Sequence, residues 1–536
     1  MSTRKLLAKN SLQVALLLGL STVLGFMRES VIAYKFGAGG SVDAYLIAMI
    51  IPTLFINLVK VSVTNTFVPV FTRYLKNNQV ELAWEMTNTV ISVLFVILVS
   101  IMALLFAASA ELVNFVAPSY AGPQAALTVK LSQLLLPTVV FSSLLGILVG
   151  VNNAHYSFFA PSAIGVVSNL ITIVSTLVLG GIWGIYGLAA GTVIGVITQF
   201  LIQIPSMYKH GFSFRFQLNL TNPGVREMML LIGPFILSGT ASQISLVVNR
   251  VLAAGLPSGA VSALYFANRL VSLPQNVFAT AVGMVVYPVL VSAVTQRDWH
   301  SVVEGLNQAI RLLLLILLPA AAGIFVLREP LVQLFFQHGA FSARDTAVTA
   351  DTVPFFLGTI IFQAMLTVLV NICYATRKMW TAISAGAIAV GVNVVFSLLL
   401  VHPLQQKGLA LANSLSAVAN VLLVGSGVYR LLSSHVHVKV NAALRSLADF
   451  VLRVGTAVII MGVSVLAYRQ VVFTGLNGRT GLVLFSLSAV AIGLFIYTFM
   501  TYILRVEEVN KGMRWAFAKA HFRLHKPTSV KKFMSN

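Results

Sequence analysis

Long apolar runs separated by short polar segments make up most of this chain. A helix needs about 20 apolar residues to cross a bilayer, and on that basis we predict about fourteen transmembrane helices. The expected spans are residues 11–36, 42–73, 84–109, 124–151, 160–180, 184–207, 227–254, 259–293, 303–327, 346–375, 380–401, 408–431, 446–468 and 481–504. Prolines interrupt the long second and eighth spans, which predicts bends that face protein or a wet cavity.

The apolar pattern contains an internal repeat. Residues 37–45, followed by Pro69, resemble residues 258–265, followed by Pro288, and aligning Val42 with Val261 superposes the two prolines without a gap. An even number of spans in each copy predicts two parallel six-helix repeats plus two C-terminal helices, in an all-α polytopic membrane protein. The predicted divisions are an N-lobe at 1–215, a C-lobe at 216–440, helices thirteen and fourteen at 441–504, and a basic cytoplasmic tail at 505–536.

Composition supports a membrane protein. The chain is 58% hydrophobic and 9% charged, whereas a soluble domain carries about a quarter charged residues. The basic start of the chain is followed by an apolar stretch without a small-residue cleavage site, so we expect a retained first helix. Cys373 is the only cysteine, which excludes disulfides within the chain and cysteine metal clusters.

The net charge of +21 lies mainly in the segments between spans. This distribution is the positive-inside bias rather than a nucleic-acid-binding stripe, and it places both termini in the cytoplasm. In the tail, basic residues interleave with aromatic ones, which suits a helix on anionic membrane lipids as well as a solvated tail. These residues are Lys511, Arg514, Trp515, Phe517, Lys519, Phe522, Arg523, Lys526, Lys531 and Lys532.

A charge inside the bilayer costs about 2.5 to 3.5 kcal/mol, so a charged residue deep within a predicted span needs an explanation. We take four of these residues as candidates for the site: Arg28, Glu29, Lys60 and Arg269. A local ion pair or a snorkelling side chain would also explain the first three. A cavity lined by the three cations would attract an anion, and arginine suits phosphate because its planar fork donates two parallel hydrogen bonds. Asp43 and Arg250 fall at span ends, where we expect interfacial side chains.

The chain has no GxxxxGK[ST] loop, no HExxH and no spaced Cys/His cluster, so the pattern favours a secondary carrier rather than an enzyme. A cation-coupled drug antiporter would need acids within the membrane, for which Asp351 and Asp449 are the candidates. A membrane enzyme acting on lipid-linked sugars would need large outer loops, and the predicted outer loops are short.

Several stretches resemble the MurJ (MviN) family of bacterial lipid II flippases, within the multidrug/oligosaccharidyl-lipid/polysaccharide exporter superfamily. The stretches are Ser21–Glu29, Phe36–Gly39, Val42–Tyr45, Gly233–Pro234, Ser242–Leu246, Tyr265–Leu270 and Phe336–Ser342. The resemblance implies a fourteen-helix flippase in the bacterial cytoplasmic membrane that moves an undecaprenyl-pyrophosphate-linked peptidoglycan precursor outward by alternating access. The last two helices would then form a groove for the prenyl tail.

The same resemblance assigns cavity roles to Arg28 and Arg269 and an outer acidic role to Asp43. We include Glu29, Lys60 and Asn268 in the predicted substrate site. The chain departs from the family pattern where charges are usual, at Thr22, Ile56, Asn57 and Asn268, so another lipid-linked polysaccharide precursor stays an alternative cargo. No cofactor is expected. The membrane potential or a cation such as Na⁺ or H⁺ would reset the empty carrier. A monomer would suffice for transport.

Overall fold

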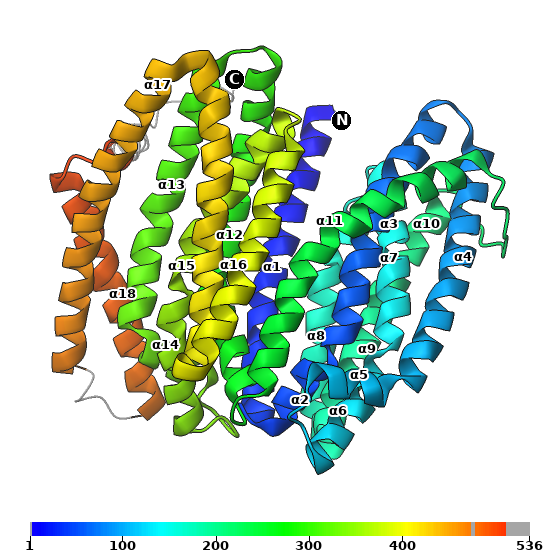
Figure 1. The fold of residues 1–536 in the computed structure, drawn as a ribbon, viewed down its shortest axis with the longest axis horizontal. Coiled ribbons are helices and arrows are strands. Elements are labelled where there is room, and N and C mark those ends of the chain that lie inside the picture. Colours follow the sequence, from blue (N-terminus) through cyan, green and yellow to red (C-terminus); the bar gives the residue numbers. More distant parts are fainter. Residues whose placement is uncertain (1–2, 473–477, 511–536) are drawn as a thin grey trace, which may run out of the picture. The chain divides into compact units, whose positions relative to one another are not determined.

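The computed structural model describes residues 3–472 and 478–510, and every regular element within them is an α-helix. The side chains of residues 3–12, 61, 234–242, 280 and 284 lie outside the description. The helices (Figure 1) are α1 (Thr3–Phe36), α2 (Gly40–Ala48), α3 (Ile50–Lys76), α4 (Val80–Ala107), α5 (Ser109–Val116), α6 (Gly122–Leu135), α7 (Pro137–Ala154), α8 (Phe159–Ile182), α9 (Ile185–Leu201), α10 (Ile204–Lys209), α11 (Pro223–Ala254), α12 (Ala260–Thr295), α13 (Trp299–Val326), α14 (Arg328–Phe336), α15 (Ala343–Ala375), α16 (Met379–Leu404), α17 (Gln406–Val472) and α18 (Gly478–Ile503).

The predicted class, an all-α polytopic membrane protein, is confirmed. In the described residues, 12 helical stretches are long and apolar enough to cross a membrane. One of them is the whole of α17, which joins two predicted spans across a break in helical geometry at Val436. The predicted seventh span falls on α11, so the helices are consistent with about fourteen spans. The parallel repeat and lobe boundaries stay predictions, and the basic tail from Lys511 lies outside the described residues.

Two predicted spans each consist of two helices that meet at one residue, within a single apolar stretch long enough to cross a membrane. The second is interrupted at Met49, between α2 and α3. The fourth is interrupted at Leu136, and α7 then begins with Pro137, which has no backbone N–H to continue the ladder of α6. Pro69, Pro274 and Pro288 lie inside helices, as the sequence predicted.

The chain forms two compact units. The first comprises Met1–Leu270, Phe335–Phe356 and Ile383–Asn420. The second comprises Val271–Leu334, Leu357–Ala382 and Val421–Asn536. Every residue of the candidate polar site described below belongs to the first unit.

Small residues bring α1 against α8 in the first unit. A Cβ atom on Gly165 of α8 would lie 1.9 Å from Ser21 Oγ, and a Cβ on Gly25 of α1 would lie 3.3 Å from Asn169 Nδ2. Such close approach of backbones is typical of helix contacts in membranes, where small residues allow interhelical hydrogen bonds. This contact fixes the part of α1 that carries Arg28 and Glu29 beside α8.

Aromatic side chains fill the core between α3, α4 and α7. Phe67 and Phe71 are fully buried and stack at 5.2 Å between ring centroids. At the end of this core, the His155 ring stacks on His210 at 4.2 Å and on Trp84 at 5.9 Å. His155 Nε2 is buried and has no hydrogen-bond partner among the described residues. The neutral ring therefore fits this stack better than the imidazolium.

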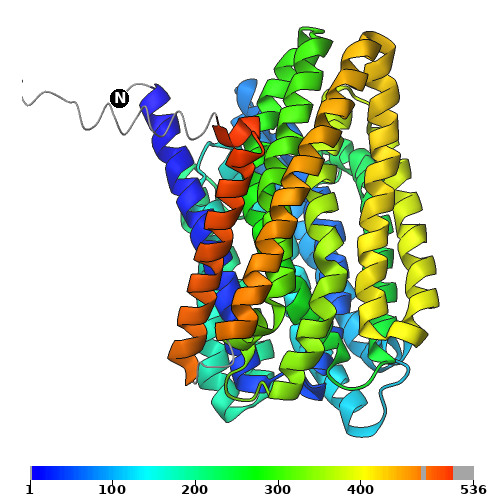
Figure 2. The same cartoon turned by 90° about the vertical axis from the view of Figure 1, so that its left-hand side faces the viewer.

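In the second unit, α13, the later part of α17 and α18 lie side by side (Figures 1 and 2). Phe450, Phe485 and Val454 lie in their shared core. Arg311 of α13 crosses to the segment after α18, donating from Nη1 to Glu508 Oε1 at 2.8 Å, and its guanidinium lies 5.0 Å from the Phe450 ring.

The His155 stack predicts a pH-dependent stability. Burial, with a smaller contribution from the positive charge of His210, lowers the pKa of His155 below its ordinary value. The unfolded chain then binds the proton more readily, so the contribution of His155 is full above about pH 6.5 and is lost as the pH falls through the lowered pKa. We expect the melting temperature to fall between pH 7.5 and 5.5, and to fall less in His155→Phe, which keeps the stacked ring. Equal pH slopes for both proteins in thermal melts would contradict this assignment.

Candidate functional site

Arg28 and Glu29 of α1 form an ion pair with 2.5 Å between Arg28 Nη2 and Glu29 Oε1. Arg28 Nη1 also donates to Asn169 Oδ1 of α8 at 3.1 Å, and the Asn169 amide in turn donates to the Ser21 carbonyl of α1. The Glu29 side chain is 2% exposed, against 25% for Arg28. The local ion pair considered from sequence is therefore present, with an asparagine holding the far side of the guanidinium.

The pair extends to α12. The Tyr265 hydroxyl donates to Glu29 Oε2 at 2.8 Å, and Arg269 Nε lies 3.5 Å from Glu29 Oε1. Tyr265 and Arg269 are four residues apart and so share one helix face. Arg269 Nη2 donates to the Tyr265 hydroxyl, and its guanidinium lies 5.0 Å from the ring centroid. One buried carboxylate thus joins the two arginines that the sequence singled out.

Arg250 of α11 is a third cation at this site. Its guanidinium lies 5.9 Å from the Tyr265 ring centroid, and within the described part of the chain it has no hydrogen-bond acceptor. It lies four residues from the end of α11, about 6 Å along the axis, whereas Arg28 lies about 12 Å from the corresponding end of α1. The interfacial position of Arg250 stays a prediction, and its contact with Tyr265 adds it to the candidate site.

The arrangement suits an anionic ligand. The guanidinium groups of Arg250 and Arg269 lie near the Tyr265 ring, and Arg28 is joined to them through Glu29, which among the described residues is the one carboxylate that pairs with two of these arginines. Arg269, at 45% exposed, and Arg28 present donors outward, while Glu29 holds them from the buried side. A phosphate group would accept charge-assisted hydrogen bonds from these donors without having to order them first.

Asp43 lies at the beginning of α2, and its side chain caps the N-terminus of α12, a helix far away in the sequence. Its carboxylate accepts hydrogen bonds from the backbone N–H of Gly259 at 2.6 Å, from that of Ser262 at 2.8 Å, and from the Ser262 hydroxyl. These N–H groups belong to the first turn of α12 and have no partner within the helix. Asp43 is 2% exposed, so it is buried against its neighbours, and its interfacial position stays a prediction. Its contacts tie α2 to the N-terminus of α12.

The remaining predicted site residues do not join the arginines. Lys60 makes no ion pair or hydrogen bond that the described residues show, and its stem lies against Gly146 of α7. Asn268 is exposed on α12 beside Arg269. The cavity roles of both residues stay predictions.

The two acids that a drug antiporter would need lie elsewhere. Asp351 is 58% exposed and pairs with Lys407, and Asp449 is 60% exposed and pairs with Arg453 one turn along its own helix. Neither forms the buried acidic site that a cationic guest would require.

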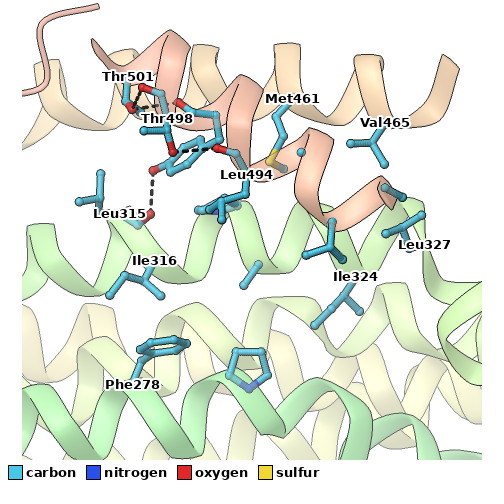
Figure 3. A pocket seen from close by; sticks show the side chains of 18 of the residues that line it. Phe278, Leu315, Ile316, Ile324, Leu327, Met461, Val465, Leu494, Thr498 and Thr501 are labelled. Carbon is cyan, nitrogen blue, oxygen red and sulfur yellow. Dashed lines mark hydrogen bonds between the residues drawn. The ribbon is translucent and has the colours of Figure 1, made fainter. Parts of the chain in front are cut away.

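The second unit contains an apolar groove of about 570 Å³ between α12, α13, the later part of α17 and α18. Figure 3 shows Leu315, Ile324, Met461 and Leu494 lining it. The hydroxyl groups in its wall are satisfied within the protein: Tyr497 donates to the Leu315 carbonyl, and Thr498 donates to a carbonyl of its own helix. The lining therefore offers contact to a hydrocarbon chain and few free polar groups.

Sequence reasoning missed Asn169, Tyr265 as a ligand of Glu29, and Arg250 as part of the site. A polar residue in an apolar span was the available signal for Asn169, because buried amides in membranes seek partners. For Tyr265, the four-residue spacing from Arg269 was visible. Nothing in the sequence placed either residue beside α1.

The helical architecture and the cationic site are those of a polytopic membrane carrier. The solved structure titled "Lipid II flippase MurJ, inward closed conformation" has a similar fold, with a TM-score of 0.77 over 92% of this chain and 99% of that one, at 22% identity. An inward-facing multidrug resistance MATE family transporter of the MOP superfamily matches 77% of this chain and 96% of its own, with a TM-score of 0.64 and 12% identity.

Sequence comparison then specifies the family. The family model described as lipid II flippase MurJ matches residues 32–505, so the chain belongs to the MurJ family of bacterial membrane transporters. A probable lipid II flippase MurJ of Haemophilus influenzae is 29% identical over 84% of this chain and 90% of its own length. The lipid II flippase MurJ of Burkholderia cenocepacia is 28% identical over 76% and 81%. Arg28 and Glu29 precede the matched range, so their importance rests on their contacts.

The Asp43 cap can be tested directly. Asp43→Asn keeps one acceptor oxygen but replaces the other with an amide that faces N–H donors, so we expect a loss of about 1–3 kcal/mol at the α2–α12 contact. Hydrogen exchange at the Gly259 and Ser262 amides should accelerate, while Ser262→Ala, which removes the hydroxyl alone, should have a smaller effect. The exposed Ser258→Ala is the matched control. Unchanged exchange in Asp43→Asn would exclude the capping role.

Proposed function

We propose that this chain moves lipid II from the inner to the outer leaflet of the bacterial cytoplasmic membrane by alternating access. The pyrophosphate group of lipid II would bind Arg28, Arg269 and Arg250. The observation that carries the proposal is the single carboxylate of Glu29 between Arg28 and Arg269, which holds two cations ready within an apolar protein. The family and its curated relatives support lipid II as the cargo.

Substrate binding and conformational change would be linked through Glu29. The pyrophosphate oxygens compete with Glu29 for the same guanidinium donors, and Glu29 is a contact between α1 and α12. A bound anion therefore weakens this contact while making new ones to the arginines. The Asp43 cap is the second contact to α12 and would act as a gate that opens when α2 and α12 separate. The prenyl tail would lie in the apolar groove of α13, α17 and α18.

The membrane potential can reset the carrier. Around α12, the guanidinium groups of Arg28, Arg250 and Arg269 exceed the carboxylates of Glu29 and Asp43 by one positive charge. The pyrophosphate of lipid II carries two negative charges, so the loaded site is net negative. A potential negative inside then drives the loaded site outward and returns the empty one, by about 2.3 kcal/mol per charge per 100 mV. Na⁺ or H⁺ coupling is the alternative. Both termini would lie in the cytoplasm, where the basic tail meets anionic lipids.

The cargo is tested in a strain depleted of its own lipid II flippase, with outward exposure of lipid II scored by an external head-cleaving probe. We expect the chain to restore exposure and growth. Arg269→Ala and Arg28→Ala should reduce exposure roughly tenfold or more, because each removes charge-assisted hydrogen bonds to the pyrophosphate. Arg226→Ala, which removes an exposed cation at the beginning of α11, is the matched control. A well-inserted protein that fails to rescue would redirect the proposal to another lipid-linked glycan.

The charge argument makes a second prediction. In proteoliposomes loaded with fluorescent lipid II, a potassium diffusion potential set by valinomycin should speed transport toward the positive side and slow transport in the opposite direction. Arg250→Gln lowers the empty site by one charge, so its return step should respond less to the potential. If transport does not change with potential but changes with a Na⁺ or pH gradient, potential-driven reset is excluded.

A further inference from the structure

The connection between α10 and α11 contains a non-helical segment, residues 213–219, followed by a turn at Leu220 and Thr221. Phe214, Phe216, Leu218 and Leu220 are 51%, 60%, 57% and 48% exposed, respectively. In extended backbone, successive side chains point to opposite faces, so Phe214, Phe216 and Leu218 are expected on one face, and Leu220 follows in the turn. The residues between them, Arg215, Gln217 and Asn219, use their N–H or amide groups to bond α4. The segment is therefore held to α4 through these groups while its apolar side chains are exposed.

Backbone groups of the segment form hydrogen bonds with side chains of α4, in a pattern like that between two β-strands. The Asn88 side chain donates from Nδ2 to the Ser213 carbonyl at 3.0 Å and accepts at Oδ1 from the Arg215 N–H at 3.1 Å. One turn later, Ser92 Oγ accepts from the Gln217 N–H at 3.1 Å. Four helical residues rise about 6 Å and two extended residues about 6.6 Å, so the two periods match. The primary amide of Asn88 thus replaces the peptide group of a neighbouring strand.

The contacts with α4 also define the depth of the segment. From Val90 to Ala107, α4 is apolar except for two serines, and Asn88 and Ser92 lie on either side of the beginning of this apolar stretch. The segment therefore lies at the boundary between polar and apolar surface. The N–H groups of Phe216 and Leu218 have no acceptor among the described residues. The lipid headgroup region supplies water and carbonyl acceptors that the hydrocarbon interior lacks.

We propose that residues 214–220 form a membrane-interface anchor, whose apolar face inserts into the lipid headgroup boundary on the side where α4 begins. The helices on either side of the connection also expose apolar side chains: Phe95, Val96 and Ile97 of α4, and Met229, Leu230 and Leu231 of α11. Phe and Leu are typical of the apolar face of segments that lie at the headgroup–acyl boundary. The anchor holds the chain connection before α11 at the membrane surface while Asn88 fixes it to α4.

The anchor is tested with nitroxide labels placed one at a time at positions 213–220, in a Cys373→Ala background reconstituted into phosphatidylethanolamine/phosphatidylglycerol nanodiscs. Collision with oxygen reports lipid, and collision with a nickel chelate reports water. We expect oxygen accessibility to exceed nickel accessibility several-fold at 214, 216, 218 and 220, and the ratio to fall at 215, 217 and 219. Ile97 serves as the lipid-facing reference and Asn78 as the water-facing one.

Two outcomes would overturn the anchor. Nickel accessibility at the even positions equal to that at Asn78 would mean a water-exposed strand, free to pair with an extended peptide. Even positions closed to both reagents would mean a protein contact, such as a second copy of this chain.

The role of Asn88 has its own variants. Asn88→Asp keeps the acceptor for Arg215 but loses the donor to Ser213, and Asn88→Leu loses both. The melting temperature serves as a folding control. The two-residue period in the ratio of oxygen to nickel accessibility should weaken in Asn88→Asp and vanish in Asn88→Leu. A period unchanged in both variants would show that α4 does not position the segment.

Discussion

The carboxylate of Glu29 is the interaction on which the polar site depends. It is buried in a protein whose surroundings offer little water, and an unpaired charge there would cost several kcal/mol. Two guanidinium groups and one phenol hydroxyl satisfy it, from α1 itself and from α12. Because Glu29 is buried, the exposed side chains of the site are those of the arginines. The acid that neutralises the cations in the empty protein is therefore also the group that orients them.

Asp43 solves a different problem with the same chemistry. Glu29 is satisfied by side chains, whereas Asp43 is satisfied mainly by the N–H groups at the beginning of α12. Both acids reach α12, about two helical turns apart, so α1 and α2 hold this helix at two heights. In the proposed mechanism, the two contacts would respond differently to a substrate. An anion would compete directly with Glu29 for arginine, but it could not replace Asp43 as a cap without reaching the helix terminus.

The sequence predicted the helices and the charges within them, but not how those charges are arranged. Hydrophobic runs define spans because each must bury about 20 residues in lipid, which is a local property. Arg28 and Asn169 are 141 residues apart and Glu29 and Tyr265 are 236 apart, and no periodicity in one helix indicates such a contact. The contacts of Asp43 and Arg250 with α12 were not predicted for the same reason, since position along a span does not reveal what a neighbouring helix offers. The alternation of residues 214–220 was visible, but its partner, Asn88, was not.

The excess of cations over acids around α12 has a further consequence for the direction of transport. A carrier whose empty site was neutral would return across the membrane without help from the potential, and its loaded site would carry the full charge of the pyrophosphate. If the pyrophosphate binds these arginines as proposed, its two negative charges would more than offset the positive charge that remains after Glu29 and Asp43 are counted. The empty and loaded sites would then have opposite sign, and one potential would favour both halves of the cycle. An additional acid beside Arg250 would remove this property even if it left the affinity of the two inner arginines intact.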